Sequence, residues 1–370
     1  MADSGLYVHV PFCASKCPYC AFASCTRSGH LAPAWRDAVL AEADRRAGRF
    51  GTFDTLYLGG GTPGLLADDL LAGLVTGLRR ALPFAADVES TIEANPADVT
   101  PARAIAWRAM GLNRVSLGVQ SFDDDDLRFL GRRHDASQAA AALVALRDAG
   151  FANVGVDLIY GLPGQALATW RDTLDRALSF GPAHLSCYGL TVEPRTPLAR
   201  SVHAGRIVMP DESRFEAFFL ETSRRLAASG FVHYEVSNFA HGLLFASRHN
   251  GKYWHHVPYL GLGPSAHSFD GARRWWNVRG VEPWLRRLGQ GRLPTAATER
   301  PTAEQRRLET LALGFRTSSG VVLSILRATP GWQAILDAQV ADGRLEVADG
   351  RAVPTVRGLL VADALARAFA

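Results

Sequence analysis

Short apolar runs alternate with longer amphipathic segments through the first half of the chain. The apolar runs predict strands, whereas the segments between them are rich in Ala and Leu and predict helices. The expected strands are residues 6–10, 55–58, 90–94, 114–119, 153–159 and 184–190, and the expected helices include residues 32–47, 66–78, 102–110 and 137–149. This alternation is typical of a parallel sheet with crossover helices.

Six βα units, with no strand-like run before the first, predict an open, partial (β/α)6 barrel rather than a closed eight-stranded one. In a parallel barrel the functional residues gather at the carboxyl ends of the strands. A cysteine-rich loop follows the first expected strand, and the glycine run 59–61 follows the second. Glu93, Gln120 and Asp157 lie at or near the ends of the next three strands. We therefore expect the functional site at this end of the barrel.

The pattern changes after about residue 205, which predicts two domains, residues 1–205 and residues 206–370. The fold class is therefore α/β, a partial barrel followed by an α+β domain. The expected elements of the second domain are helices at 213–228, 303–313 and 333–341 and a hairpin of strands 344–347 and 352–355. Asp349-Gly350 is the signal of a type I′ turn in that hairpin. The end of the chain resembles a winged helix, which we expect to be structural because it lacks a basic recognition face.

Composition narrows the possible classes of function. The 370 residues are 48% hydrophobic, and a net charge of +4 gives no argument for binding to nucleic acid or an anionic membrane. No apolar stretch reaches the ~20 residues that span a bilayer, and no signal peptide is expected at the N-terminus. We therefore expect a cytoplasmic monomer or dimer without an integral membrane segment. Five cysteines in so long a chain favour metal binding or catalysis over a disulfide framework.

Three cysteines lie in a C-x3-C-x2-C arrangement directly behind the first expected strand, at Cys13, Cys17 and Cys20. A four-iron four-sulfur cluster takes one thiolate at each corner, so three thiolates leave one iron open to a small molecule. A structural zinc site needs four ligands, and zinc with Cys25 as the fourth is the alternative. The neighbouring glycine run favours the cluster, because glycines let a ligand approach the backbone. The alternative role of those glycines is to form a tight βα turn.

Together these features resemble the radical S-adenosylmethionine (SAM) superfamily, and within it the oxygen-independent coproporphyrinogen oxidase (HemN) group. The matching segments occur in order along nearly the whole chain. They are LYVHVPFCASKCPYCAF, LYLGGGTP, TIEANP, GLNRVSLGVQSF, LGRRH, VGVDLIYGLPGQ, HLSCYGLTVEP, YEVSNFA, RHNGKYW, YLGLGPSAHSF and WWNV. The resemblance implies a radical SAM barrel followed by a HemN-type C-terminal domain.

The resemblance also implies that Cys13, Cys17 and Cys20 hold a 4Fe-4S cluster and that SAM chelates its fourth iron. An electron from the cluster would then cleave SAM to a 5′-deoxyadenosyl radical. The positions that match the family's SAM contacts are Tyr7, Tyr19, Gly60, Gly61, Thr62, Glu93, Gln120, Arg132 and Asp157. Arg132 can pair with the SAM carboxylate, and an ordinary ion pair is the alternative for Arg132 and Asp157. His9 shares the inward face of its strand with Tyr7, and a hydrogen-bonded core histidine is as consistent with this position as a functional one.

Two features of the sequence favour one branch of this group. The porphyrinogen-decarboxylating enzymes usually carry C-x3-C-x2-C-x-C, but the position two after Cys20 is Phe22. The Phe-bearing form resembles the HemW branch, which consists of heme chaperones. Residues His249, Asn250, Tyr253 and Trp254 match the HNxxYW motif that is associated with heme in that branch. HemW-like loops often carry Asp where this chain has Ala21.

Two roles are open for the HNxxYW segment. In the first it binds heme, because an imidazole can ligate heme iron, and Tyr and Trp can pack on a porphyrin face. In the second, Tyr253 and Trp254 belong to an interdomain core and His249 is a satisfied polar residue. His255 and His256 are further candidate ligands.

The resemblance therefore implies a heme-binding chaperone that carries a 4Fe-4S cluster and SAM. Heme would be passed to hemoprotein acceptors, such as membrane-associated respiratory enzymes. One alternative is an enzyme, oxygen-independent coproporphyrinogen III dehydrogenase, which decarboxylates propionates oxidatively. Another is a radical SAM enzyme of a different kind, such as a methyltransferase. Phe22 and the HNxxYW motif favour the chaperone.

Overall fold

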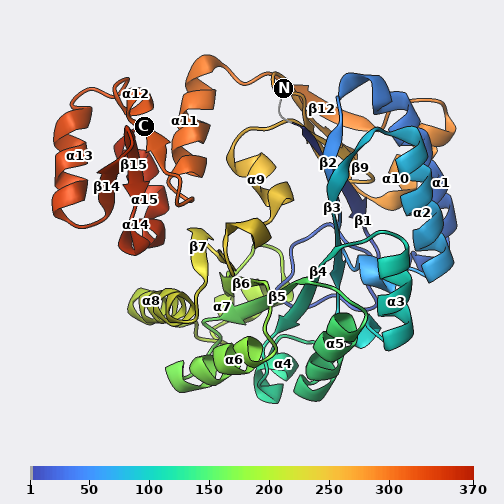
Figure 1. The fold of residues 1–370 in the computed structure, drawn as a ribbon, viewed down its shortest axis with the longest axis horizontal. Helices are drawn as coiled ribbons and strands as arrows, with labels where there is room; N and C mark the ends of the chain where they lie inside the picture. Colours follow the sequence, from blue (N-terminus) through green and yellow to red (C-terminus); the bar gives the residue numbers. More distant parts are fainter. Residues whose placement is uncertain (1–2) are drawn as a thin grey trace.

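The computed structural model describes residues 3–370, which are built around one twelve-stranded mixed sheet (Figure 1). Six neighbouring strands follow one another in chain order, and each adjacent pair is parallel. They are β1 (Ser4–Val10), β2 (Phe53–Gly60), β3 (Phe84–Ala94), β4 (Arg114–Gln120), β5 (Asn153–Tyr160) and β6 (His184–Gly189). All six predicted strands are confirmed. The second neighbour of β1 is β9 and that of β6 is β8, so β1 and β6 do not close the barrel between them.

Crossover helices connect the parallel strands, and Figure 1 shows them on the outer side of the curved row of strands. They are α1 (Ala32–Arg46), α2 (Asp68–Ala81), α3 (Pro101–Ala109), α4 (Asp124–Phe129), α5 (Ala136–Asp148) and α6 (Leu167–Ser179). In α2, Leu70, Leu74 and Leu78 recur every fourth residue and are buried, which turns one apolar stripe onto the sheet. Short 3-10 helices add η1 (Gly29–Leu31), η2 (Ala47–Arg49), η3 (Pro63–Leu65), η4 (Pro96–Asp98) and η5 (Leu243–Phe245).

The second half of the chain extends the same sheet at both edges. Strand β9 (Tyr259–Leu262) lies parallel to β1, and antiparallel strands follow it: β10 (His267–Phe269), β11 (Arg274–Asn277) and β12 (Thr295–Glu299). The other edge adds β8 (Asn238–Ala240) and β7 (Val232–Glu235) beside β6. Helices α7 (Pro197–His203), α8 (Glu212–Ala228), α9 (Arg248–Trp254) and α10 (Val281–Gly289) connect them. The hydrophobic pattern predicted α8 but none of these strands, because three to five residues are too few to show a period.

A separate unit ends the chain and is coloured orange to red in Figure 1. Its elements are α11 (Ala303–Gly314), β13 (Val321–Val322), α12 (Leu323–Leu326), α13 (Trp332–Ala341), β14 (Leu345–Ala348), β15 (Arg351–Pro354), α14 (Val356–Leu360) and α15 (Ala362–Ala368). The predicted hairpin is confirmed as β14 and β15. Asp349 and Gly350 both have positive φ, 49° and 71°, as a type I′ turn requires.

The hydrophobic cores divide the chain at a different place from the sequence pattern. One core runs from Leu6 to Leu288 and so crosses residues 205 and 206. A second core, from Leu311 to Phe369, belongs to the terminal unit. The division into residues 1–205 and 206–370 therefore stays a prediction from sequence, while the cores separate between β12 and α11.

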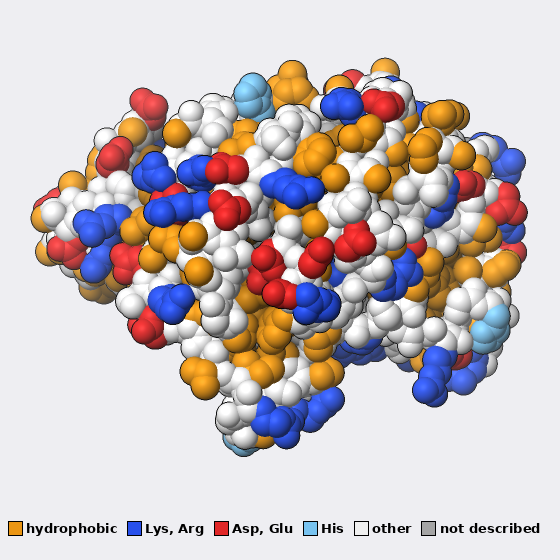
Figure 2. All heavy atoms as spheres, turned by 90° about the horizontal axis from the view of Figure 1, so that it is seen from below, with side chains coloured by type: hydrophobic (Ala, Val, Ile, Leu, Met, Phe, Trp, Pro, Cys, Tyr) orange, Lys and Arg blue, Asp and Glu red, His pale blue; other side chains and the backbone are white. Residues whose placement is uncertain are grey.

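The surface offers no dominant charge on the face seen in Figure 2, where acidic and basic side chains are interspersed over most of the view. Among residues 3–370, no helix combines the length and the apolar character needed to cross a membrane.

Candidate functional site

A cavity of about 610 Å³ lies at the carboxyl ends of the parallel strands. Most of the residues predicted from the sequence meet in its wall. Those present are Cys13, Cys17, Cys20, Tyr19, Gly60, Gly61, Thr62, Glu93, Gln120, Arg132, Asp157 and Asn250. Tyr7, His249, Tyr253 and Trp254 are placed elsewhere, and Tyr7 lines a second cavity beside the first.

The cysteine loop is closed by its own backbone. The Cys13 N–H donates to the Cys25 carbonyl at 2.9 Å, and the Cys25 N–H donates to the Pro11 carbonyl at 2.7 Å. Cys25 thus closes the base of the loop, and its side chain is not part of the cavity wall formed by the described residues. Burial raises the pKa of the Cys25 thiol. This position gives Cys25 a structural role and weakens the zinc alternative.

Side chains from neighbouring strand ends contact the other sulfur atoms. Thr62 Oγ1 donates to Cys13 Sγ at 3.6 Å, and Arg132 Nη1 donates to Cys17 Sγ at 3.4 Å. A guanidinium beside a sulfur suits an anionic ligand. Within residues 3–370, no three His, Cys, Asp or Glu side chains converge as ligands of a single metal ion. Thiols spread around a cavity suit a cluster, in which each thiolate has its own iron.

Two half-buried carboxylates face the cavity, Glu93 from β3 and Asp157 from β5. Glu93 accepts from the Gly60 N–H at 3.0 Å and from the Tyr57 hydroxyl at 2.9 Å. Burial raises the pKa of Glu93 to about 7, although these two donors oppose the rise. Asp157 accepts from Ser116 Oγ at 2.9 Å, and burial likewise raises the pKa of Asp157. Each carboxylate therefore retains acceptor capacity toward the cavity.

Arg132 and Asp157 are not an ordinary ion pair among the described residues. Arg132 instead bonds Cys17 and the Gly118 carbonyl, at 2.8 Å for the latter. Its Nε is buried without a hydrogen-bond partner from residues 3–370. Arg132 can therefore bind a further anion at the cavity.

Backbone conformation is strained where β4 ends. Gln120 has a φ of 70°, which is unusual for a residue with a side chain and is concentrated at functional sites in proteins. At the end of β2, Gly60 has a φ of 110°, and a Cβ there would lie 2.4 Å from the ring of His9. A Cβ on Gly61 would lie 2.7 Å from the Val10 carbonyl oxygen. These glycines are therefore also required for close packing in a tight βα turn, which was the alternative role expected for them.

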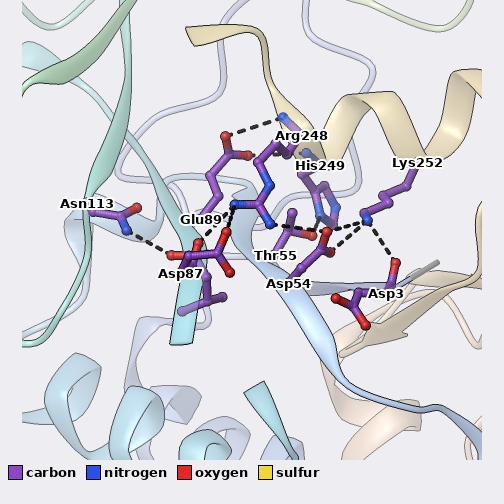
Figure 3. Close-up of polar contacts among 10 residues, drawn as sticks. Asp3, Asp54, Thr55, Asp87, Glu89, Asn113, Arg248, His249 and Lys252 are labelled. Atoms are coloured by element: carbon purple, nitrogen blue, oxygen red, sulfur yellow. Dashed lines mark hydrogen bonds and ion pairs between the residues drawn. The ribbon is translucent and has the colours of Figure 1, made fainter. Parts of the chain in front are cut away.

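The HNxxYW segment forms helix α9, and Figure 3 shows the polar contacts of Arg248, His249 and Lys252 from this helix. His249 is buried, with Nδ1 2.8 Å from Thr55 Oγ1 and Nε2 2.9 Å from the Tyr253 hydroxyl. Burial lowers the pKa of His249 to about 3, so the ring is neutral. Neither ring nitrogen is free to ligate iron in this arrangement, which matches the alternative of a satisfied polar residue.

The other residues of α9 anchor the helix to the sheet. Lys252 Nζ lies 2.7 Å from Asp54 Oδ1, and Arg248 Nη2 lies 3.2 Å from Asp54 Oδ2 (Figure 3). Trp254 Nε1 is buried without a hydrogen-bond partner in the described chain. Asn250 is the member of the motif that reaches the first cavity.

Sequence reasoning missed several residues of the cavity wall. They are Arg114, Ser116, His184, Ser186 and Tyr188. They occupy alternate positions of β4 and β6, and alternate residues of a strand face the same side. Applying this rule from Gly118 and from the end of β6 would have found them.

Comparison with known proteins places the chain in a family. Residues 7–177 match the Radical SAM superfamily. A heme chaperone HemW of Mycobacterium tuberculosis (strain ATCC 25618 / H37Rv) is 38% identical, and the match covers 98% of this chain and 94% of that protein. The HemW of Bacillus subtilis (strain 168) is 33% identical over 85% of this chain and 84% of its own. The chain belongs to the HemW family.

The HemW relationship agrees with the likeness to a solved structure. The coproporphyrinogen III oxidase HemN of Escherichia coli has a TM-score of 0.84 and 25% identity, over 99% of this chain and 90% of that one. The predicted fold class, a radical SAM barrel with a HemN-type C-terminal part, is therefore confirmed.

Phe22, the residue that distinguishes the cysteine loop from the C-x3-C-x2-C-x-C form, lies at the cavity. The side chain is 70% exposed and lines both the first cavity and the second. An aromatic ring therefore stands in the wall of both cavities, at a position where a cysteine would have added a fourth thiol to the wall of the first.

Proposed function

We propose that the protein binds heme and delivers it to hemoprotein acceptors, while carrying a 4Fe-4S cluster and SAM. The observation that carries the proposal is the identity of 38% to a heme chaperone over 98% of the chain. Phe22 beside the cysteine loop supports it. Membrane-associated respiratory enzymes are the proposed acceptors, and a cytoplasmic monomer or dimer is the proposed state.

The first cavity fits the cluster and SAM. Cys13, Cys17 and Cys20, which line this cavity, would hold the cluster, and SAM would occupy the space beside it. SAM bound at the open iron supplies radical chemistry when an electron reaches it. Arg132, with its unpartnered Nε, suits the SAM carboxylate, and Glu93 and Asp157 suit hydroxyl or ammonium donors. The remaining proposed SAM contacts in this wall are Tyr19, Gly60, Gly61, Thr62 and Gln120, whereas Tyr7, also proposed from the sequence, lines the adjoining cavity.

SAM binding is expected to strengthen as pH rises through about 7, the pKa of Glu93. The ionised carboxylate attracts a cationic ligand, and its share rises with pH, so affinity should rise about tenfold between about pH 6 and about pH 8. Equilibrium dialysis of the cluster-loaded protein measures this. Glu93→Gln should bind SAM weakly and without that pH dependence.

Glu235→Gln is the matched control, because burial also raises the pKa of Glu235 to about 7, yet this residue lies outside the cavity wall. The control should keep the parent's pH profile. A profile that survives in Glu93→Gln, or disappears in Glu235→Gln, would contradict the assignment of Glu93.

Heme binding tests the proposed function directly. Titration of ferric heme into the purified, cluster-loaded protein is expected to reach saturation at stoichiometric heme with a shifted Soret band. The loaded protein should then transfer its heme to an apo-hemoprotein. Absence of stoichiometric binding by the parent protein would refute the chaperone function.

A second candidate is oxidative decarboxylation of coproporphyrinogen III, which the likeness to HemN over 99% of the chain favours. Anaerobic incubation with SAM, a reductant and coproporphyrinogen III distinguishes the two. A chaperone should yield no vinyl product. Vinyl product formed stoichiometrically with 5′-deoxyadenosine would establish the enzyme instead.

A further inference from the structure

A second cavity of about 590 Å³ adjoins the first. The two share Ala21, Phe22, Gly60 and Glu93 in their walls. Its other walls come from β1 and from the antiparallel strands β10 to β12 and the turns beside them. The volume falls within the range of roughly 300–1,000 Å³ that small-molecule and cofactor sites occupy.

One histidine in this cavity is free to bind a ligand. His9 is engaged at both ring nitrogens, 3.0 Å from the Tyr7 hydroxyl and 2.7 Å from the Ala23 carbonyl. His267, on β10, is exposed, and its ring makes no hydrogen bond to another of the described residues. An imidazole nitrogen that faces a cavity without a partner can ligate a metal ion.

The neighbours of His267 fix its orientation. The ring stacks on that of Trp276, with 5.6 Å between ring centroids and 21° between planes. His267 and Trp276 face each other in the β10–β11 ladder, so the sheet itself holds the stacked pair. An imidazole held in one plane costs little entropy when it binds a ligand.

Polar features of the same wall indicate a ligand with an anionic edge. Ser265 has a φ of 62°, and its hydroxyl is buried without a partner among residues 3–370. Strain of this kind in a residue with a side chain is concentrated at functional sites. Arg279 is exposed at the cavity, and no ion pair within the described chain engages it. Phe22 adds an exposed aromatic surface to the cavity wall.

We propose that this second cavity is the heme site, with His267 as the iron ligand and Arg279 paired with a propionate. This inference rests on the proposed function and says where in the protein heme would bind. A lone pair of the neutral His267 ring bonds to iron, and no electron is transferred. Trp276, whose ring stacks on that of His267, would act as a positioning residue for it, and the exposed ring of Phe22 would lie against the porphyrin.

Ferric heme titrated into the cluster-loaded protein tests the iron ligand. His267→Ala is expected to weaken binding about tenfold or more and to remove the spectral signature of histidine ligation. His255→Ala is the matched control, because His255 is exposed next to α9 but lines neither cavity. The control should bind heme as the parent does.

The outcomes separate the site from the function. If the parent binds heme and His267→Ala binds it with unchanged affinity and spectrum, the site is refuted while the chaperone function stands. The same follows if His255→Ala removes the histidine signature. If the parent binds no heme, the proposed function fails and the site falls with it.

Heme dimethyl ester, which lacks the propionate charges, tests Arg279 without changing the iron ligand. The parent should bind the ester about tenfold more weakly than heme. Arg279→Gln should bind both ligands alike, with the affinity that the parent shows for the ester. An equal loss for both ligands in Arg279→Gln would refute the propionate contact.

Discussion

Cys17→Ala is expected to abolish the 4Fe-4S cluster. Each cluster thiolate holds its own iron, so no neighbouring residue can replace a missing one at the same corner. Arg132, which bonds Cys17 Sγ at 3.4 Å, would be left with a further unpartnered donor beside an open corner. Iron and acid-labile sulfide, measured after anaerobic reconstitution, should fall to background, and SAM binding at the open iron should be lost with them.

Cys25→Ala is the control for the cluster experiment. Cys25 contributes backbone hydrogen bonds to the base of the loop, and alanine retains these. The variant should therefore reconstitute the full cluster. A stoichiometric zinc ion in the parent that disappears in Cys25→Ala would instead establish a four-cysteine zinc site.

His249→Ala is expected to destabilise the fold by about 3 kcal/mol. The substitution removes a buried ring and leaves the hydroxyls of Thr55 and Tyr253 without their present partners. Buried polar groups without partners, together with the cavity, account for an effect of this size. Urea denaturation of the anaerobic protein measures the free energy of unfolding.

His249 should also contribute to the dependence of stability on pH. Its pKa of about 3 in the folded state lies below the value of an unfolded histidine, near 6.5. The unfolded chain therefore binds more protons between these values, so stability falls as pH falls below about 6.5. His249→Ala should remove this component of the acid sensitivity.

An exposed histidine provides the comparison. His30→Ala, in η1, should change the free energy of unfolding by less than about 0.5 kcal/mol.

His249→Ala also tests the heme ligand. In the folded state this variant should retain heme binding, because neither nitrogen of the parent ring is available. A stable His249→Ala protein that has lost heme would assign the iron ligand to α9 after all.

The barrel could be predicted from sequence because its signals are local. Each of β1 to β6 is a largely apolar run of at least six residues, and the motifs follow the strand ends at fixed places. The short strands β7 to β12 could not be found this way, because three to five residues are too few to show a period. The pairing of β9 with β1 and of β8 with β6 also joins residues that lie far apart in the chain.

The environment of the HNxxYW segment was equally beyond local reasoning. Thr55 and Asp54, which bond His249 and Lys252, precede them by 194 and 198 residues. A motif states which side chains are present, but whether an imidazole is free depends on such distant contacts. His267, by contrast, lies in the segment YLGLGPSAHSF, which supported the family resemblance without indicating a role for this residue.

The parallel pairing of β1 with β9 has a consequence for how the chain is made. Gly5 is paired with Tyr259, so β1 cannot pair with β9 until most of the chain has been synthesised. Until then one edge of β1 is open, and an open edge is a template for pairing with other chains. The cysteine loop directly follows that same strand. Strand β1 is therefore involved both in cluster loading, through the loop that follows it, and in pairing with β9. If the cluster is loaded first, it enters a barrel in which one edge of β1 is still unpaired.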